Sequence, residues 1–186
     1  LPPTHIAPIH SVKTSYLTQA ISVASSGVTI KQSNVSAASA KLDVKVQLRN
    51  AQDTEANRTV TVTVYDKDNA IKATAEKQVA LAKGAASSAD LSLTMTNPHL
   101  WNGKKDPYMH RVVVELKDGE RVEHRVEQPL GLRFYEFSKT EGFKLNGTPY
   151  PLRGIAIHDA VKDKGRAASD ADRKLDLDLM LETGAN

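Results

Sequence analysis

The residues with the clearest chemical potential are His158, which ends the stretch LNGTPYPLRGIAIH from Leu145, and Asp159, which follows it. The stretch has the look of the approach to an active site. A neutral imidazole donates one hydrogen bond and accepts another, whereas a carboxylate only accepts. Because neighbours in an extended segment point apart, we expect His158 and Asp159 to face different surroundings.

The sequence lacks the residues or motifs of several other kinds of site. The absence of cysteine excludes disulfides, thiolate metal ligands and a cysteine nucleophile. No Gly-x-Ser-x-Gly elbow and no glycine-rich phosphate loop occur. The remaining histidines lack the spacing of metal ligands on one helix; they are His5, His10, His99, His110 and His124. We therefore expect neither a metal nor a cofactor.

Composition and charge bound the class of protein. With 186 residues, of which 40% are hydrophobic, the chain suits one full domain and part of another. Its 25 basic and 22 acidic residues are scattered, which argues against a nucleic-acid partner. No apolar run reaches the roughly 20 residues of a membrane span, so we expect no membrane partner. Cysteine-free chains occur in the cytoplasm, the periplasm and outside cells, which leaves the compartment open. Since the chain begins without Met, we expect a segment of a longer protein.

The elements that would position His158 begin with a run of strands. From about Val28 to Gln128 apolar and polar residues alternate with period two, most clearly from Leu42 to Leu48. Asp66 to Asn69 and Asp118-Gly119 are turn signals between strands. Seven or so strands without a helix predict an immunoglobulin-like β-sandwich. A small β-barrel is the competing fold.

The character of the sequence changes after Pro129. Asn146-Gly147 predicts a tight hairpin, because both turn positions require positive φ, and Leu152 to Ile157 predicts a buried strand. Ser169 as a cap and the carboxylates after it predict a helix from Asp170 to Thr183. Leu175 to Leu181 also alternates as a strand would, so the caps decide for the helix.

Three stretches together resemble glycoside hydrolase family 2, the group of β-galactosidases, β-glucuronidases and β-mannosidases. They are Asn97 to Trp101 with Asp106-Pro-Tyr108, then Gly142 to Gly154, then His158-Asp159 with Gly165, Asp170, Asp172, Asp176, Leu179-Met180 and Gly184-Ala-Asn186. They are similar to the late sandwich, the hairpin before the catalytic barrel, and the first strand, loop and helix of that barrel. Residues before Asn97 match in architecture only.

The resemblance implies a division of the chain. Residues 1–27 would be a leader or linker from a preceding jelly-roll-like domain, 28–130 the sandwich, and 131–186 the hairpin and the start of a (β/α)₈ barrel that continues after Asn186. Whether the last ~50 residues are ordered without the rest of such a barrel, which needs about 250 residues, stays open. The exposed leucines of the helix would favour self-association of the chain.

The resemblance also implies a function. The parent would cleave terminal β-galactosides with retention, or act as a β-glucuronidase or β-mannosidase. Galactosidases of the family often have Asn-Arg before the histidine, and Ala156-Ile157 stand there in this chain. His158 and Asp159 would bind substrate, Arg153 would be structural and Trp101 would pack. The two catalytic glutamates would lie on later barrel strands, so this chain would contain no catalytic residue and be inactive alone.

Two further readings remain open. The chain could be a free-standing β-sandwich that serves as an adhesion or carbohydrate-binding module. It could also be an autonomous hydrolase, but retaining glycosidases need two carboxyl groups about 5–5.5 Å apart. The carboxylates near the expected site are Asp159, Asp163 and Glu141, which match neither position and are expected to be solvated.

Overall fold

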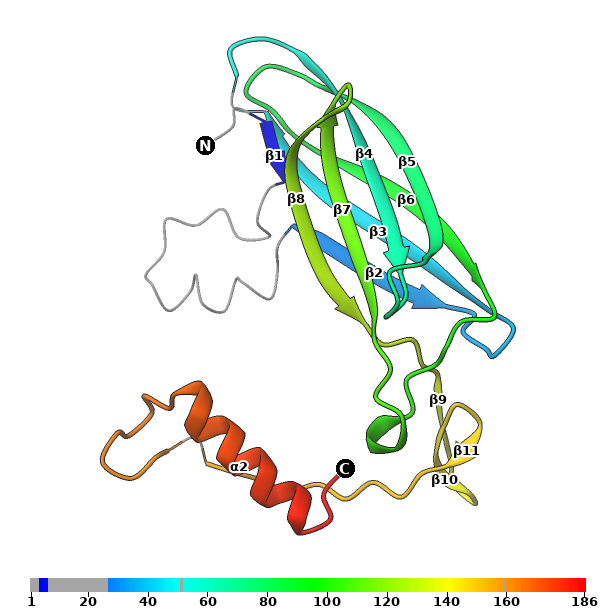
Figure 1. Cartoon of the computed structure of the whole chain (residues 1–186), viewed down its shortest axis with the longest axis vertical. Helices are drawn as coiled ribbons and strands as arrows, with labels where there is room; N and C mark the ends of the chain where they lie inside the picture. Colours follow the sequence, from blue (N-terminus) through cyan, green and yellow to red (C-terminus); the bar gives the residue numbers. More distant parts are fainter. Residues whose placement is uncertain (1–3, 7–26, 51, 159) are drawn as a thin grey trace. The chain divides into compact units, whose positions relative to one another are not determined.

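The computed structural model describes residues 4–6, 27–50, 52–158 and 160–186 (Figure 1). The chain forms two compact units. Unit 1 comprises Leu1–Trp101 and Tyr108–Arg133, and unit 2 comprises Asn102–Pro107 and Phe134–Asn186.

Unit 1 is a sandwich of two antiparallel sheets. In the first sheet β3 (Ser39–Asn50) pairs with β6 (Ala86–Thr96) along one edge and with β1 (Thr4–Ile6) and β2 (Val28–Ser33) along the other. The second sheet has the order β5 (Ile71–Leu81), β4 (Ala56–Tyr65), β7 (His110–Asp118) and β8 (Arg121–Leu130). No strand of the described chain joins one sheet to the other, so the predicted sandwich is confirmed and the small barrel is wrong.

The alternation in the sequence builds the core between these sheets. Side chains at every second position of each strand are buried, and their neighbours face solvent. Each fully buried Leu or Val contributes about 2 kcal/mol of hydrophobic stabilisation. The inward residues with the lowest exposure include Leu42, Val44, Val46, Leu48, Val60, Val62, Val64, Met95, Val112, Val114 and Leu116.

The turns form where the residue types predicted them. Asp66 Oδ1 accepts hydrogen bonds from the N–H groups of Asp68 and Ala70, at 2.9 and 2.8 Å, and Asn69 has φ of 64°. These bonds, from Ala70 above all, lower the pKa of Asp66. A two-residue turn after Asp118 connects β7 to β8. Turn chemistry thus closes the β4–β5 and β7–β8 hairpins of the second sheet.

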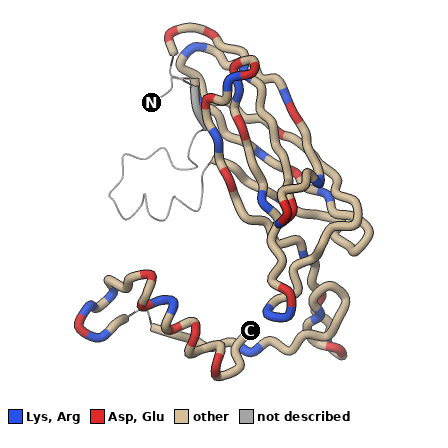
Figure 2. The backbone as a smooth tube through the Cα atoms, viewed as in Figure 1, with Lys and Arg blue, Asp and Glu red and all other residues tan. Residues whose placement is uncertain are grey.

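Charged residues of both signs are distributed over the strands of the sandwich (Figure 2). Several oppositely charged neighbours form exposed pairs such as Lys45 with Asp90. No helix in the described part of the chain is both long and apolar enough to cross a membrane.

The sequence did not predict β1, because a strand of three residues leaves no periodicity to detect. Residues 1–3 and 7–26, the remainder of the expected leader apart from Gly27, lie outside the described residues.

Unit 2 contains a small sheet, a 3₁₀ turn and one helix. The sheet has the order β11 (Thr148–Pro149), β10 (Gly142–Leu145) and β9 (Tyr135–Ser138). The predicted hairpin is confirmed, since Asn146 and Gly147 have φ of 51° and 79° between the paired residues Leu145 and Thr148. The turn η1 (Gly103–Lys105) comes from the connection between β6 and β7.

The predicted helix is also confirmed, as α2 (Asp170–Glu182). The predicted buried strand at Leu152 to Ile157 is wrong in this chain. The structure contains no strand at 150–158, and Leu152, Ile155 and Ile157 are 57%, 47% and 56% exposed. A strand requires a neighbour that completes its ladder hydrogen bonds, and no other strand among the described residues pairs with this segment.

Candidate functional site

A capping box starts α2 and ties it to the loop that follows His158. Ser169 Oγ accepts a hydrogen bond from the Asp172 N–H, and the Asp172 carboxylate accepts one from the Ser169 N–H at 2.9 Å. Lys164 Nζ donates to the same carboxylate at 2.8 and 2.9 Å. The Lys164 bond, reinforced by Ser169, holds the pKa of Asp172 well below its usual range. Asp172 therefore stays ionised and fastens the loop at neutral pH.

The loop itself is closed by backbone bonds. The N–H of Val161 donates to the carbonyl of Gly165 at 2.8 Å, and the N–H of Gly165 donates back at 2.9 Å. Asp163 lies at the tip of this turn with φ of 66° and an exposed side chain. The predicted solvation of the Asp163 carboxylate is thereby confirmed. The turn, and no contact in a site, sets the conformation of Asp163.

His158 lines an open hollow of about 370 Å³ within unit 2. The hollow has the chain from Ile155 to Ala160 on one side and α2 on the other. Most of its lining is apolar, from residues such as Ile157, Leu179 and Met180, and Asp176 adds a carboxylate. The structure thus brings His158 and Asp176 to one hollow, and the sequence did not single out Asp176 for this place. Asp159, the second predicted substrate-binding residue, lies outside the described residues.

The segment that leads to His158 is bonded to the end of the chain. The Arg153 N–H donates to Asn186 Oδ1 at 2.9 Å, and Asn186 Nδ2 donates to the Pro151 carbonyl at 2.8 Å. The Asn186 N–H donates to the Arg153 carbonyl at 3.1 Å. Arg153 thus contributes its backbone to this contact.

The loop 102–107 is built into unit 2 although it connects two strands of the sandwich. Asn102 Oδ1 accepts from Asn146 Nδ2 at 2.6 Å, and Lys104 Nζ donates to the Ala185 carbonyl at 3.1 Å. The ring of Tyr150 occupies the space beside Gly103 where a Cβ would lie. Sequence reasoning missed these contacts, because nothing in the local pattern connects residues so far apart.

Trp101 packs within unit 1 and takes no part in the hollow. Its N–H donates to the Leu132 carbonyl at 2.8 Å, Gly131 lies against its side chain, and the Arg133 guanidinium lies 5.1 Å from its ring centroid. The interpretation of Trp101 as a packing residue fits these contacts.

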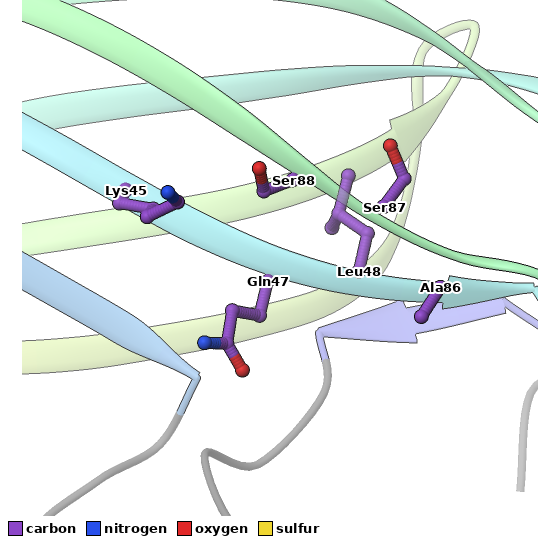
Figure 3. A pocket seen from close by; sticks show the side chains of 6 residues that line it. All are labelled: Lys45, Gln47, Leu48, Ala86, Ser87 and Ser88. Atoms are coloured by element: carbon purple, nitrogen blue, oxygen red, sulfur yellow. The ribbon is translucent and has the colours of Figure 1, made fainter.

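A second hollow, of about 360 Å³, lies on β3 and β6 of the sandwich (Figure 3). Lys45 and Gln47 of β3 and Ser87 and Ser88 of β6 supply its polar groups. The residues that line it include neither a carboxylate nor a histidine. This surface can donate and accept hydrogen bonds, and Lys45 is the ionisable group in its lining.

The hollow of unit 2 contains groups that can bind a polar ligand. An exposed imidazole can bond hydroxyl groups in both senses, and the apolar lining can cover the face of a ring. Glu141, the other carboxylate considered near the site, is exposed and paired with Lys144 at 2.6 Å. Among the described residues no group of His, Asp and Glu is arranged to hold a metal.

Comparison with known proteins places the chain in a family. Residues 22–133 match the family Glycosyl hydrolases family 2. The chain is 39% identical over 165 residues to a beta-glucuronidase of Bacteroides fragilis, a match that covers 88% of this chain and 23% of that protein. It is 26% identical over 160 residues to the beta-galactosidase BoGH2A of Bacteroides ovatus, which covers 86% of this chain and 19% of that protein.

A solved structure agrees with the arrangement of the elements. The beta-glucuronidase of Bacteroides uniformis superposes with a TM-score of 0.87 at 28% identity, covering all of this chain and 21% of that one. The chain thus spans about a quarter or less of the length of these relatives. From the sandwich match and these relatives it follows that the chain belongs to glycosyl hydrolases family 2.

Proposed function

We propose that this chain is the linking sandwich and the entrance of the catalytic barrel in a retaining glycosidase that removes a terminal β-linked sugar. The hollow beside His158 carries the proposal. There the exposed imidazole of His158 lies beside an apolar lining. The hollow is bounded by the segment that follows the hairpin and by the capped helix α2. Such a surface suits a sugar, whose hydroxyl groups need hydrogen-bond partners and whose ring face is apolar.

In this role His158 binds a substrate hydroxyl, and Asp159 beside it is the second substrate-binding candidate. The acid/base and the nucleophile come from elsewhere in the longer protein. Retention requires two carboxyl groups about 5–5.5 Å apart, whereas Asp163 and Glu141 occupy exposed turns and ion pairs. The 186-residue chain alone is therefore expected to be inactive.

The sugar is inferred from the relatives. Two of the three proteins compared above are named beta-glucuronidases, and one of them has the highest identity of the three. Ala156 and Ile157 stand where galactosidases often have Asn-Arg. Both points favour a β-glucuronoside. A β-galactoside, the substrate that the sequence resemblance first implied, is the second candidate and is favoured by the likeness to BoGH2A.

Chromogenic substrates test this proposal. The 186-residue chain and the longer protein that contains it are assayed with p-nitrophenyl β-glucuronide and p-nitrophenyl β-galactoside. We expect no turnover by the chain alone and hydrolysis of the glucuronide by the longer protein. Preference for the galactoside would reverse the choice of sugar. Turnover by the chain alone that follows the protein through purification would overturn the assignment of the catalytic groups.

Limited proteolysis separates this proposal from a free-standing adhesion or carbohydrate-binding module. If the region after Leu145 is only the start of a barrel, it should be cleaved readily. Its apolar side chains from Leu152 to Leu181 are exposed, and a segment with few buried contacts unfolds locally at low cost. A self-contained module would resist cleavage there as well as in the sandwich. Mass spectrometry of the products decides between the two outcomes.

A further inference from the structure

We propose that Asn186 is a positioning residue, whose side chain holds the backbone at Pro151 and Arg153 and thereby sets the place of His158. The first part concerns the fold of unit 2 alone. The second part, the effect on substrate, rests on the proposed function.

The contact has the pattern of a strand pair. Asn186 Oδ1 accepts from the Arg153 N–H, and Asn186 Nδ2 donates to the Pro151 carbonyl. A carboxamide presents one acceptor and one donor side by side, as a peptide group does. The Asn186 N–H adds a third bond, to the Arg153 carbonyl at 3.1 Å. One residue thus supplies three hydrogen bonds to a segment that has no strand partner among the described residues.

Asn186 is itself fixed by the end of α2. The Gly184 N–H donates to the Leu181 carbonyl and the Ala185 N–H to the Met180 carbonyl, each at 3.1 Å, and Gly184 has φ of 91°. These two bonds make a Schellman motif, which gives the chain one defined exit from a helix. Lys104 Nζ holds the Ala185 carbonyl from the other side at 3.1 Å. The amide of Asn186 is therefore a fixed group and not a mobile end.

The three hydrogen bonds from Asn186 to Pro151 and Arg153, the Asn186 clamp, set where His158 lies. His158 is five residues beyond Arg153, and the intervening residues are exposed and unpaired in any sheet. Ile155 and Ile157 reach the hollow on the same side as His158, opposite Met180 and Leu179 of α2. Because the turn at Gly184 and Ala185 connects Asn186 to the end of α2, the bonds of Asn186 to Pro151 and Arg153 join the two sides of that hollow. Release of the clamp would let His158 move relative to α2.

Hydrogen exchange tests the clamp in the 186-residue chain. In N186A we expect exchange of the Arg153 amide to accelerate about tenfold or more, while core amides such as Val62 and Val114 keep their rates. N186D keeps the acceptor and loses the donor, so it should retain part of the Arg153 protection. N57A makes the same truncation at an exposed asparagine of β4 and should change neither. An Arg153 exchange rate that does not respond to N186A would overturn the inference.

A double-mutant cycle in the longer protein tests the effect on His158. We expect N186A to lower kcat/KM by about tenfold in the unmodified background and by less than about threefold in H158A, because the two changes remove one function. Equal losses in both backgrounds would show that Asn186 does not act through His158. An absence of any glycosidase activity would sink the proposed function, and the exchange experiment would still decide whether the clamp exists.

Discussion

Arg58 Nε donates to Glu123 Oε2 at 2.7 Å and joins β4 to β8, two strands that β7 separates in their sheet. The two side chains are only 9% and 5% exposed. Arg121 also pairs with Glu123 at 2.8 Å, and Asp118 pairs with Arg58 at 3.3 Å. A charge network thus lies at one end of the second sheet, with the buried pair Arg58–Glu123 at its centre and the exposed Asp118 and Arg121 at its rim.

Removal of one partner from this network should destabilise the sandwich. We expect E123A to lower the free energy of unfolding by about 3 kcal/mol, because it leaves the Arg58 guanidinium buried without its main counter-ion. D90A, which breaks an exposed pair with Lys45, should cost no more than about 0.5 kcal/mol. Urea unfolding followed by the fluorescence of Trp101, the only tryptophan, measures both. Equal effects of the two variants would contradict a buried network.

The stability of the sandwich should fall in mild acid because of His110. Its side chain is 2% exposed and neither ring nitrogen has a hydrogen-bond partner among the described residues. Burial lowers the pKa of His110 below the usual 6.5. The nearby backbone of Leu130 opposes this shift, and the charges of His99, Asp66 and Lys72 are smaller influences. The ring of Tyr108 stacks on His99 with 3.9 Å between the ring centroids. It packs against His110 in a T-shaped arrangement with 5.0 Å between the centroids.

The sign follows from proton binding. Below about pH 6.5 the unfolded chain protonates this histidine while the folded chain does not. The stability that neutral, buried His110 provides is therefore complete above about pH 6.5. It is lost as the pH falls from there towards the lowered pKa of His110 in the folded chain. Unfolding midpoints between pH 8 and pH 5 should fall in the unmodified chain and fall less in H110F. H158F, at an exposed histidine, serves as the control. An equal fall in all three would assign the effect to other groups.

Gly103 and Gly84 offer a matched pair for separating backbone strain from packing. Their φ angles are 62° and 64°, so alanine should cost about 1 kcal/mol at either position. Only Gly103 has a neighbour in the way, the ring of Tyr150. We expect G103A to displace that ring and to accelerate exchange of the Tyr150 amide, which is bonded to the Phe143 carbonyl at 3.0 Å. G84A should leave this amide unchanged; an equal response would exclude the packing role.

The exposed leucines of α2 should make the chain self-associate. Leu175, Leu177, Leu179 and Leu181 are 59%, 57%, 51% and 46% exposed, and α2 has no buried residue. Burial of apolar surface between copies is favourable at about 25 cal/mol per Å². Sedimentation should show a mass that rises with concentration, and L175K/L179K should reduce that rise. A strictly monomeric species at every concentration would contradict this prediction.

Most strands of the sandwich, the hairpin and the start of α2 could be predicted because their signals are local. Alternation from Leu42 to Leu48 fixes which side chains are buried, and Asp66 and Asn146-Gly147 carry their turn geometry in their own side chains and backbone. Ser169 and Asp172 likewise specify the start of α2 without help from distant residues. The strand expected at Leu152 to Ile157 failed for the opposite reason, since a strand exists only with a partner.

The sequence by itself determined most strands of the sandwich, the hairpin and the capped helix, because residue type and spacing act within a few positions along the chain. The candidacy of His158 came from the family resemblance of the sequence. Only the tertiary structure decided that Asp176 shares a hollow with His158, that Asn186 clamps Pro151 and Arg153, and that Arg58 meets Glu123. These pairs are separated by 18 to 65 residues. Their contact depends on how whole elements pack, which no short window of sequence encodes.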